Sequence, residues 1–126
     1  MNTDSHLQDA DLTRAIIGAT YDAFNHLGFG YQEKYYQRAV AIELTKRKIP
    51  FHREQAQPLR YEGKIIGRYF ADFVVHDRIV LELKVANAIL EAYVKQVLGY
   101  LRACGLTVGI LAVMTPDGVL IKRVVL

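Results

Sequence analysis

Apolar residues recur at helical spacing near the start of the chain and change to strand spacing near its middle. The first helical stripe contains five residues: Leu12, Ile16, Ala19, Ala23 and Leu27. This spacing of three to four residues predicts an amphipathic helix. Asp9 or Asp11 is a candidate N-cap for this helix, and Gly28 is a candidate stop.

A second helical stripe follows the short "GFG" interruption at residues 28–30. Tyr36, Val40 and Leu44 are spaced four apart, which predicts a helix from about Gln32 to Lys48. Pro50 lies just beyond the basic end of this segment, where a helix has to stop.

From Phe51 onward the pattern is that of strands, with one further helix between them. Pro58 makes the first strand an edge strand, because proline cannot donate to a hydrogen-bond ladder. Apolar residues at 90, 94, 97, 98 and 101 predict the third helix, which Gly105 ends. The predicted strands cover residues 51–61, 64–75, 78–85, 107–115 and 119–126. We therefore expect an α/β domain with a mixed β-sheet flanked by helices, in the order α-α-β-β-β-α-β-β.

Length and composition fit one folded domain over residues 1–126, with residues 1–10 as a flexible tail. Hydrophobic residues make up 52% of the chain, yet no apolar run is long enough to span a bilayer. The polar N-terminus does not resemble a signal peptide, and Cys104 is the only cysteine, which excludes an internal disulfide. We expect a cytoplasmic protein without a membrane partner. The formal net charge of +3 is compatible with a polyanionic partner but does not require one.

The segment 77–85, "DRIVLELKV", places an acid and a base on one face of a hydrophobic strand. Side chains alternate between the two faces of a strand, so Glu82 and Lys84 share a face. The opposite face is wholly apolar and contains Ile79, Leu81, Leu83 and Val85.

A second carboxylate, Asp72, lies on the preceding strand, where strict alternation puts it on the face opposite Ala71 and Phe73. A two-residue loop at His76 and Asp77 would turn Glu82 away from Asp72. A three-residue loop that also includes residue 78 would set Asp72 opposite Glu82, and Asp77 could take the left-handed conformation that such loops need. Two opposed carboxylates repel, but a hard divalent cation such as Mg²⁺ reverses that penalty. Lys84 beside such a cation could orient an attacking water or neutralise charge on a phosphate.

These residues resemble the signature of the PD-(D/E)XK nuclease superfamily, in which an aspartate precedes an E-x-K strand. Ala71 stands where the eponymous proline would be. The stretch "GYQEKYY" reads as G-x-x-E-x-x-Y through Gly30, Glu33 and Tyr36, and it resembles the small bacterial GxxExxY proteins of that superfamily. Gln96 and Tyr100 form a Q-x-x-x-Y pattern similar to that of the superfamily's exonuclease branch.

The resemblance implies a restriction-endonuclease-like core and a nuclease that uses Mg²⁺ or Mn²⁺ to hydrolyse phosphodiesters in DNA or RNA. Asp72 and Glu82 would be side-chain metal ligands, and the Leu83 carbonyl would be a main-chain ligand. Lys84 would be the catalytic base or would position water, and Glu33 would be an accessory acid. The substrate contacts would be Gln96 and Tyr100. Superfamily nucleases of this size usually form homo-oligomers, so we expect at least a dimer.

Each residue also has a simpler interpretation. Glu82 and Lys84 could form a solvated strand face, and Asp72 could be a structural acid paired with a neighbouring cation. Glu33 suits the first turn of a helix because an acid there favours the helix dipole. Gln96 could be solvated, and Tyr36 and Tyr100 could be core or interface aromatics.

Two rival functions stay open besides the nuclease. One is a non-catalytic binding or self-assembling protein, because eight tyrosines and five phenylalanines could exceed what one small core hides. The other is hydrolysis of nucleotides or small phosphoesters. A large basic surface beside Asp72 would favour a polymeric substrate over both.

Overall fold

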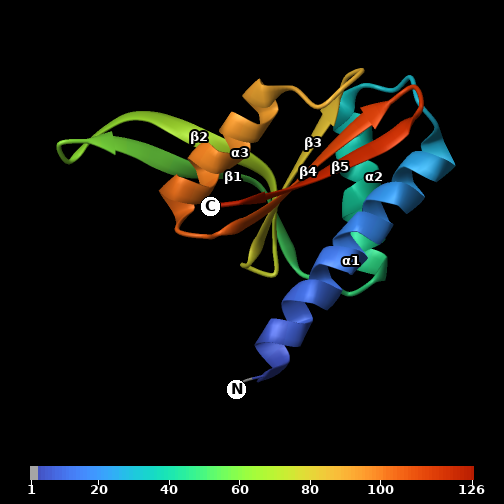
Figure 1. The fold of residues 1–126 in the computed structure, drawn as a ribbon, viewed down its shortest axis with the longest axis horizontal. Coiled ribbons are helices and arrows are strands. Elements are labelled where there is room, and N and C mark those ends of the chain that lie inside the picture. The colour runs from blue at the N-terminus through green and yellow to red at the C-terminus, as the bar shows by residue number, and fades with distance from the viewer. Residues whose placement is uncertain (1–2) are drawn as a thin grey trace.

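The computed structural model describes residues 3–126, with side chains from Asp9 onward, and shows an α/β fold (Figure 1). The element order is the expected one, α-α-β-β-β-α-β-β. The helices are α1 (Thr3–Leu27), α2 (Glu33–Lys46) and α3 (Glu91–Cys104). The strands are β1 (Phe51–Tyr61), β2 (Lys64–Val75), β3 (Ile79–Val85), β4 (Val108–Thr115) and β5 (Gly118–Val125).

The five strands form one mixed sheet in the order β1-β2-β3-β4-β5. Strands β3 and β4 are parallel, and the other neighbours are antiparallel. Helix α3 is the crossover that a parallel pair requires. Strand β1 lies at the edge of the sheet, as Pro58 predicted, and β4 is buried along nearly all its length.

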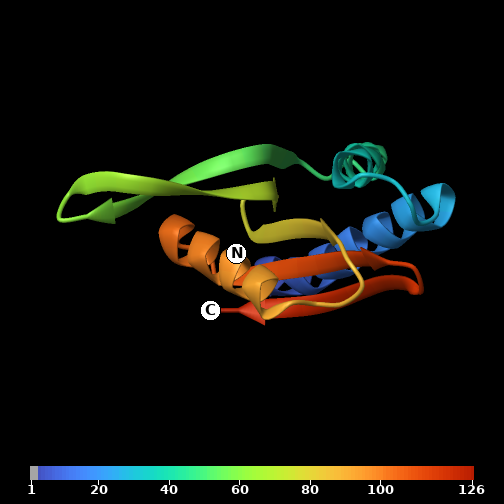
Figure 2. The same ribbon diagram turned by 90° about the horizontal axis from the view of Figure 1, so that it is seen from above.

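Helices cover both faces of the sheet, α1 and α2 on one side and α3 on the other (Figure 2). The first core cluster joins Ile16 and Tyr36 to Leu81 on β3. The second joins Leu101 on α3 to Val80 on the opposite face of β3. Adjacent residues of β3 therefore pack into different clusters, which is the alternation expected of a strand covered on both sides.

The β2–β3 hairpin has the three-residue loop, so the register that brings the two acids together is the observed one. Val75 pairs with Ile79 and Phe73 with Leu81, which leaves residues 76–78 as the loop. Asp77 has a φ of 55°, the left-handed conformation that was expected of it, and His76 has the same φ.

Strict alternation along β2 was wrong at one place, and that place is Asp72. Phe73 packs into the α1–α2 cluster, whereas Ala71 packs into the α3 cluster although it should share the face of Phe73. The partner strand has a left-handed residue at the same level, because Glu54 (φ 53°) lies between the residues paired with Phe73 and Ala71. The β1–β2 ribbon therefore exchanges its two faces at Glu54 and Asp72.

The helix ends differ in part from the sequence expectation. Helix α1 starts at Thr3, so neither Asp9 nor Asp11 is its N-cap. It ends before Gly28, which has a φ of 79° and donates its main-chain N–H to the Phe24 carbonyl. Flexibility of residues 1–10 stays a prediction, and residues 1 and 2 lie outside the described residues.

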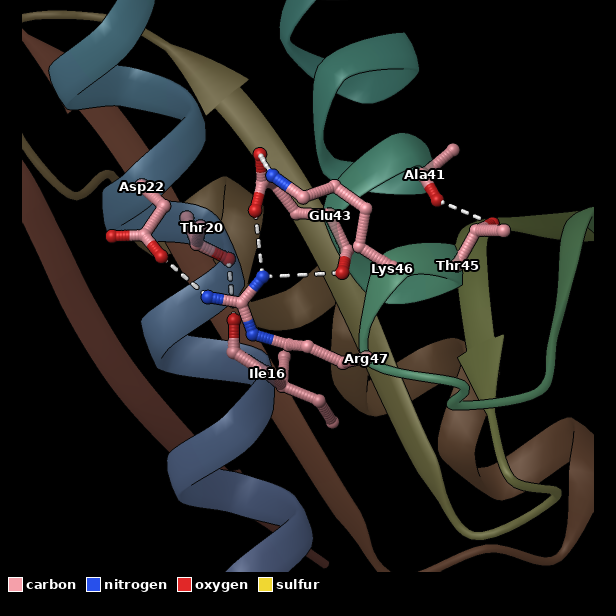
Figure 3. A network of polar contacts seen from close by, with 8 residues as sticks. All are labelled: Ile16, Thr20, Asp22, Ala41, Glu43, Thr45, Lys46 and Arg47. Atoms are coloured by element: carbon pink, nitrogen blue, oxygen red, sulfur yellow. Dashed lines mark hydrogen bonds and ion pairs between the residues drawn. The ribbon is translucent and has the colours of Figure 1, made fainter.

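Arg47, in the basic segment 46–48 ("KRK"), joins α2 to α1 at the end of α2 (Figure 3). Its guanidinium donates to the main-chain carbonyl of Glu43 at 3.1 Å and to the Glu43 carboxylate at 2.7 Å, and it pairs with Asp22 on α1. The hydrogen bond from Arg47 holds the pKa of Glu43 below its usual value.

None of the helices within residues 3–126 is long and apolar enough to cross a membrane.

Candidate active site

Asp72 and Glu82 meet where strands β2 and β3 separate. The backbone pairing of β2 with β3 ends at Phe73–Leu81. Beyond this pair, the two strands are joined by hydrogen bonds between the main chain and the two carboxylates. The main-chain N–H of Asp72 donates to Glu82 Oε1 at 3.1 Å, and the N–H of Leu83 donates to Asp72 Oδ2 at 2.8 Å. Each acid is therefore fixed by the main chain of the facing strand, which sets the geometry of the pair.

The second carboxylate oxygen of Glu82 lies between an amide and an ammonium group. Gln96 on α3 donates to Oε2 at 3.1 Å, and Lys84 Nζ lies 3.5 Å from the same atom. The expectation that Glu82 and Lys84 share a strand face is confirmed. Only 4% of Glu82 is exposed, so this carboxylate is a buried, bonded group and not part of a solvated strand face.

Lys84 is held from two sides within the site. Its side chain is 18% exposed, and Nζ lies 5.4 Å from the ring centroid of Tyr93 on α3. A cation over an aromatic face is attracted by the negative charge of the ring. Tyr93 and Glu82 together fix the position of the ammonium group.

Burial raises the pKa values of Asp72, Glu82 and Glu33, and nearby negative charge adds to the rise for the two glutamates. Burial raises the pKa of Glu82 to about 7, and the Asp72 charge adds to that rise. Burial also raises the pKa of Asp72, against the hydrogen bond from Leu83 and the charge of Lys84. Clustered carboxylates with raised pKa values are typical of functional sites.

Helix α2 reaches the site through its first turn. Glu33 is half-buried, and burial raises its pKa, while the charge of Lys84 lowers it and that of Asp72 raises it. Gln37, one turn later, donates to Glu33 at 3.4 Å and also stabilises the ionised form of Asp72 by hydrogen bonding. The structure thus brings Glu33 near Asp72 and Lys84. The sequence signal for Gln37 was its position four residues after Glu33, which puts both on one helix face.

Arg53 on β1 is a second residue that the sequence reasoning missed. Its guanidinium lies 5.2 Å from the ring centroid of Phe73, with which it pairs across the strands, and its charge favours ionised Asp72. Arg53 Nε is buried and has no hydrogen-bond partner among the residues described. No spacing in the sequence marks this residue, because its position depends on the β1–β2 register.

Tyr100 and Tyr36 lie outside the acid cluster. Tyr100 is 1% exposed within the α3 core cluster, and burial raises its pKa, while a hydrogen bond from Gln57 lowers it. Its role as a substrate contact stays a prediction. Tyr36 is a fully buried core residue whose hydroxyl donates to the Gly28 carbonyl at 2.5 Å. The tyrosine of G-x-x-E-x-x-Y thereby ties α2, and Glu33 with it, to the end of α1.

The carboxylate oxygens of Asp72 and Glu82 are the type of ligand that a hard cation prefers. Among the side chains described, no group of three or more His, Cys, Asp or Glu is arranged to hold a metal ion. Asp72 is nevertheless a half-buried and Glu82 a buried carboxylate, and burial raises the pKa values of both, a penalty that a divalent cation would offset.

Comparison with known proteins identifies the family and supports the fold. A family model described as the PD-(D/E)XK nuclease superfamily matches residues 10–123. The chain is similar in fold to the crystal structure of SSO0001, with a TM-score of 0.61 and 20% sequence identity. That match covers 73% of this chain and 48% of the other, so the chain spans about half of its length. A search of the curated proteins finds no match.

Proposed function

The chain belongs to the PD-(D/E)XK nuclease superfamily, and from this premise we propose that it is a metal-dependent nuclease acting on DNA or RNA. The observation that carries the proposal is the mutual arrangement of Asp72, Glu82 and Lys84. The half-buried Asp72 and the buried Glu82 each accept a hydrogen bond from the main chain of the facing strand, and the largely buried Lys84 lies 3.5 Å from Glu82. Burying charged side chains costs free energy, and a purely structural strand does not require a cluster of this kind.

The side chains divide the work of phosphodiester hydrolysis among them. Lys84 orients the attacking water and takes up its proton, or neutralises charge that develops on the phosphate. Gln96 and Tyr93 position Glu82 and Lys84. Glu33 serves as an accessory acid beside Lys84. It is half-buried, and the charge of Lys84 lowers its pKa.

Asp72, Glu82 and the main-chain carbonyl of Leu83 would hold Mg²⁺ or Mn²⁺. Oxygen donors are the ligands that these hard cations prefer, and few protein carboxylates are needed. When bound, the ion would supply positive charge that polarises the phosphate and eases loss of a proton from water.

Three further assignments belong to the same proposal. The arrangement of Gly30, Glu33 and Tyr36 supports membership of the GxxExxY proteins, since Tyr36 anchors the helix that carries Glu33. We also propose a homo-oligomer, at least a dimer, and a cytoplasmic location in keeping with the single cysteine.

A non-catalytic binding or self-assembling protein is the second candidate function. The observation that favours it is the number of large apolar side chains at the surface, among them Phe29, Tyr31, Ile66 and Phe70. Exposed apolar patches mark interaction surfaces. A non-catalytic function does not explain why the ammonium group of Lys84 is held beside Glu82.

The nuclease proposal is tested by incubating the protein with single- and double-stranded DNA and RNA in Mg²⁺, Mn²⁺ or EDTA. We expect metal-dependent cleavage that Lys84→Ala reduces by roughly 10²- to 10⁴-fold, the usual contribution of a positioned acid–base group. Lys95→Ala is the matched control, because Lys95 lies on the solvent side of α3 with its side chain 72% exposed. Cleavage that survives EDTA, or equal losses in both variants, would refute the proposal. A folded protein silent on all four substrates would favour the binding candidate.

A further inference from the structure

The outer part of the β1–β2 hairpin projects from the body of the protein, past α3 (Figures 1 and 2). We define the arm as residues 55–71, the part of the ribbon beyond Glu54 and Asp72. Every residue from 59 to 66 is exposed. At its base, the Tyr69 ring packs closely on Gly99 of α3. The arm therefore has one face on α3 and one face open.

The strand register assigns residues to these two faces. Tyr69 and its partner Gln57 face α3, so the neighbouring pairs Phe70–Ala56 and Arg68–Pro58 face away from it. The bulge between Leu59 and Arg60 adds one residue to β2, and Arg60 pairs with Ile65 beyond it. By alternation along β1, this shift puts Arg60 and Ile65 on the side of the open face, at the edge of β1 where Arg60 also lines a pocket between the arm and α3. The open face consequently carries Phe70, Arg68, Arg60 and Ile65.

The open face is positively charged and aromatic, and it leads to the acid cluster. Phe70 is 57% exposed and lies two residues before Asp72. Neither Arg60 nor Arg68 forms an ion pair among the side chains described. From strand geometry their Cα atoms lie about 8 Å apart, so both can contact one polynucleotide backbone. The open face lies on the side of the sheet that α2 covers, from which Gln37 contacts Asp72.

We propose, resting on the nuclease function above, that the open face of the arm binds a single polynucleotide strand and leads it to Asp72. Arg60 and Arg68 contact phosphates, because a guanidinium matches phosphate geometry with paired donors. Phe70 stacks on an unpaired base, a contact that tolerates any sequence. The substrate is therefore nucleic acid that is single-stranded at the site.

A second copy of this chain fits the arm less well. Packing two open faces about a two-fold axis would bring Arg60 and Arg68 near their own copies, and like charges repel. Addition of a strand at the edge of β1 is opposed by Pro58, which lacks a donor. A polyanion meets neither obstacle.

The test is binding of a fluorescently labelled single-stranded oligonucleotide in EDTA, measured by anisotropy over a range of salt concentrations. We expect R60Q/R68Q to weaken binding at least tenfold and to lower the slope of log K against log salt by about 1.4, the contribution of two phosphate contacts. Phe70→Ala should weaken binding by about 5- to 150-fold, the usual contribution of one stacked base. The matched control is K122Q/R123Q on β5, where both side chains are also exposed, and it should bind like the wild type. Thermal melting confirms that each variant is folded.

Three results would overturn the proposal: equal loss in the control, unchanged binding in all arm variants, or equal affinity of the wild type for blunt duplex. A change in sedimenting mass with the arm variants would assign the open face to self-association instead. Binding in EDTA does not depend on catalysis, so the two proposals fail separately. A wild type that binds a strand through the arm but cleaves nothing loses only the nuclease function. An arm variant that cleaves as fast as the wild type would refute only the role of the arm.

Discussion

Glu82 accepts a hydrogen bond from the main-chain N–H of Asp72, at 3.1 Å, at the point where their two strands separate. This contact gives the carboxylate a structural role besides any catalytic one. It also holds the half-buried Asp72 beside the buried Glu82, and the pKa values of both are raised. The cost of this arrangement is measurable through the pH dependence of stability.

Replacing Glu82 with glutamine should stabilise the metal-free protein at neutral pH. The pKa of Glu82 rises from 4.5 to about 7 in the folded state. Between these pH values the folded protein holds a proton that the unfolded chain has released, so its stability falls as pH rises. The full loss is about 3 kcal/mol. Glu82→Gln removes it, since the amide oxygen still accepts from Asp72 and carries no charge.

The measurement is thermal melting in EDTA at several pH values from 4 to 8. The gain in melting temperature of Glu82→Gln should be largest at pH 8 and vanish near pH 4.5. Glu91→Gln is the control, because its side chain is 82% exposed. A loss of stability at pH 8 in Glu82→Gln would show that the negative charge itself stabilises the fold.

Gln96 and Tyr100 should differ sharply when mutated although they belong to one sequence pattern. Gln96→Ala removes a donor from Glu82, and loss of such a supporting contact typically costs about 10- to 100-fold in activity or metal affinity. Tyr100→Phe removes a hydroxyl that is hydrogen-bonded to Gln57 outside the acid cluster, so we expect unchanged activity per folded molecule, a result that would count against the substrate contact predicted from the sequence. Cleavage kinetics over a titration of Mg²⁺ measure both. Equal effects of the two variants would contradict this division.

The sequence predicted the element order and the acid–base pair because both depend on local patterns. Glu82 and Lys84 are two apart on a regular strand, which fixes their common face. The loop at residues 76–78 was one of two registers that the residues allowed, and the backbone conformation of His76 and Asp77 decides between them. Sequence reasoning could not find the exchange of faces at Asp72. That exchange needs a left-handed Glu54 on another strand, and glutamate carries no signal for this conformation.

Arg53 and Gln37 illustrate the same limit. Arg53 lies beside Asp72 only because β1 pairs with β2 in one register. Gln37 follows Glu33 by one turn, so its face could be predicted from α2, but its contact with Asp72 depends on how α2 packs on the sheet. Tyr36, in contrast, lay on the predicted inward stripe and is buried there.

Removing the Tyr36 hydroxyl should destabilise the protein without creating a cavity in its core. Tyr36→Phe keeps the buried ring and loses the 2.5 Å hydrogen bond to the Gly28 carbonyl. The half-buried Gly28 carbonyl would lose its donor and the Tyr31 N–H would lose its acceptor, which together cost about 1–2 kcal/mol. Urea unfolding measures the loss, and Tyr35→Phe, at a tyrosine that is 43% exposed, should change the free energy of unfolding far less. Equal effects would mean that the hydroxyl of Tyr36 contributes nothing specific.

Replacing glycine with alanine should change the free energy of unfolding in opposite directions at Gly99 and at Gly18. A methyl group at Gly99 would lie 2.5 Å from Cε1 of Tyr69, so the ring that seats the arm on α3 must move. Overpacking of this kind typically costs about 1–3 kcal/mol, which outweighs the roughly 1 kcal/mol that alanine gains over glycine in a helix. Gly18 lies within α1 with nothing within 4 Å of an added methyl group, so Gly18→Ala should stabilise by that helical gain.

Chemical denaturation of both glycine variants tests this contrast. We expect Gly99→Ala to lower the free energy of unfolding and Gly18→Ala to raise it. Combining Gly99→Ala with Tyr69→Ala removes the clash, so the second substitution should cost less in the Gly99→Ala background than in the wild type. Additive effects of the two would show that Tyr69 and Gly99 do not contact each other in solution. The arm would then be seated on α3 by other residues.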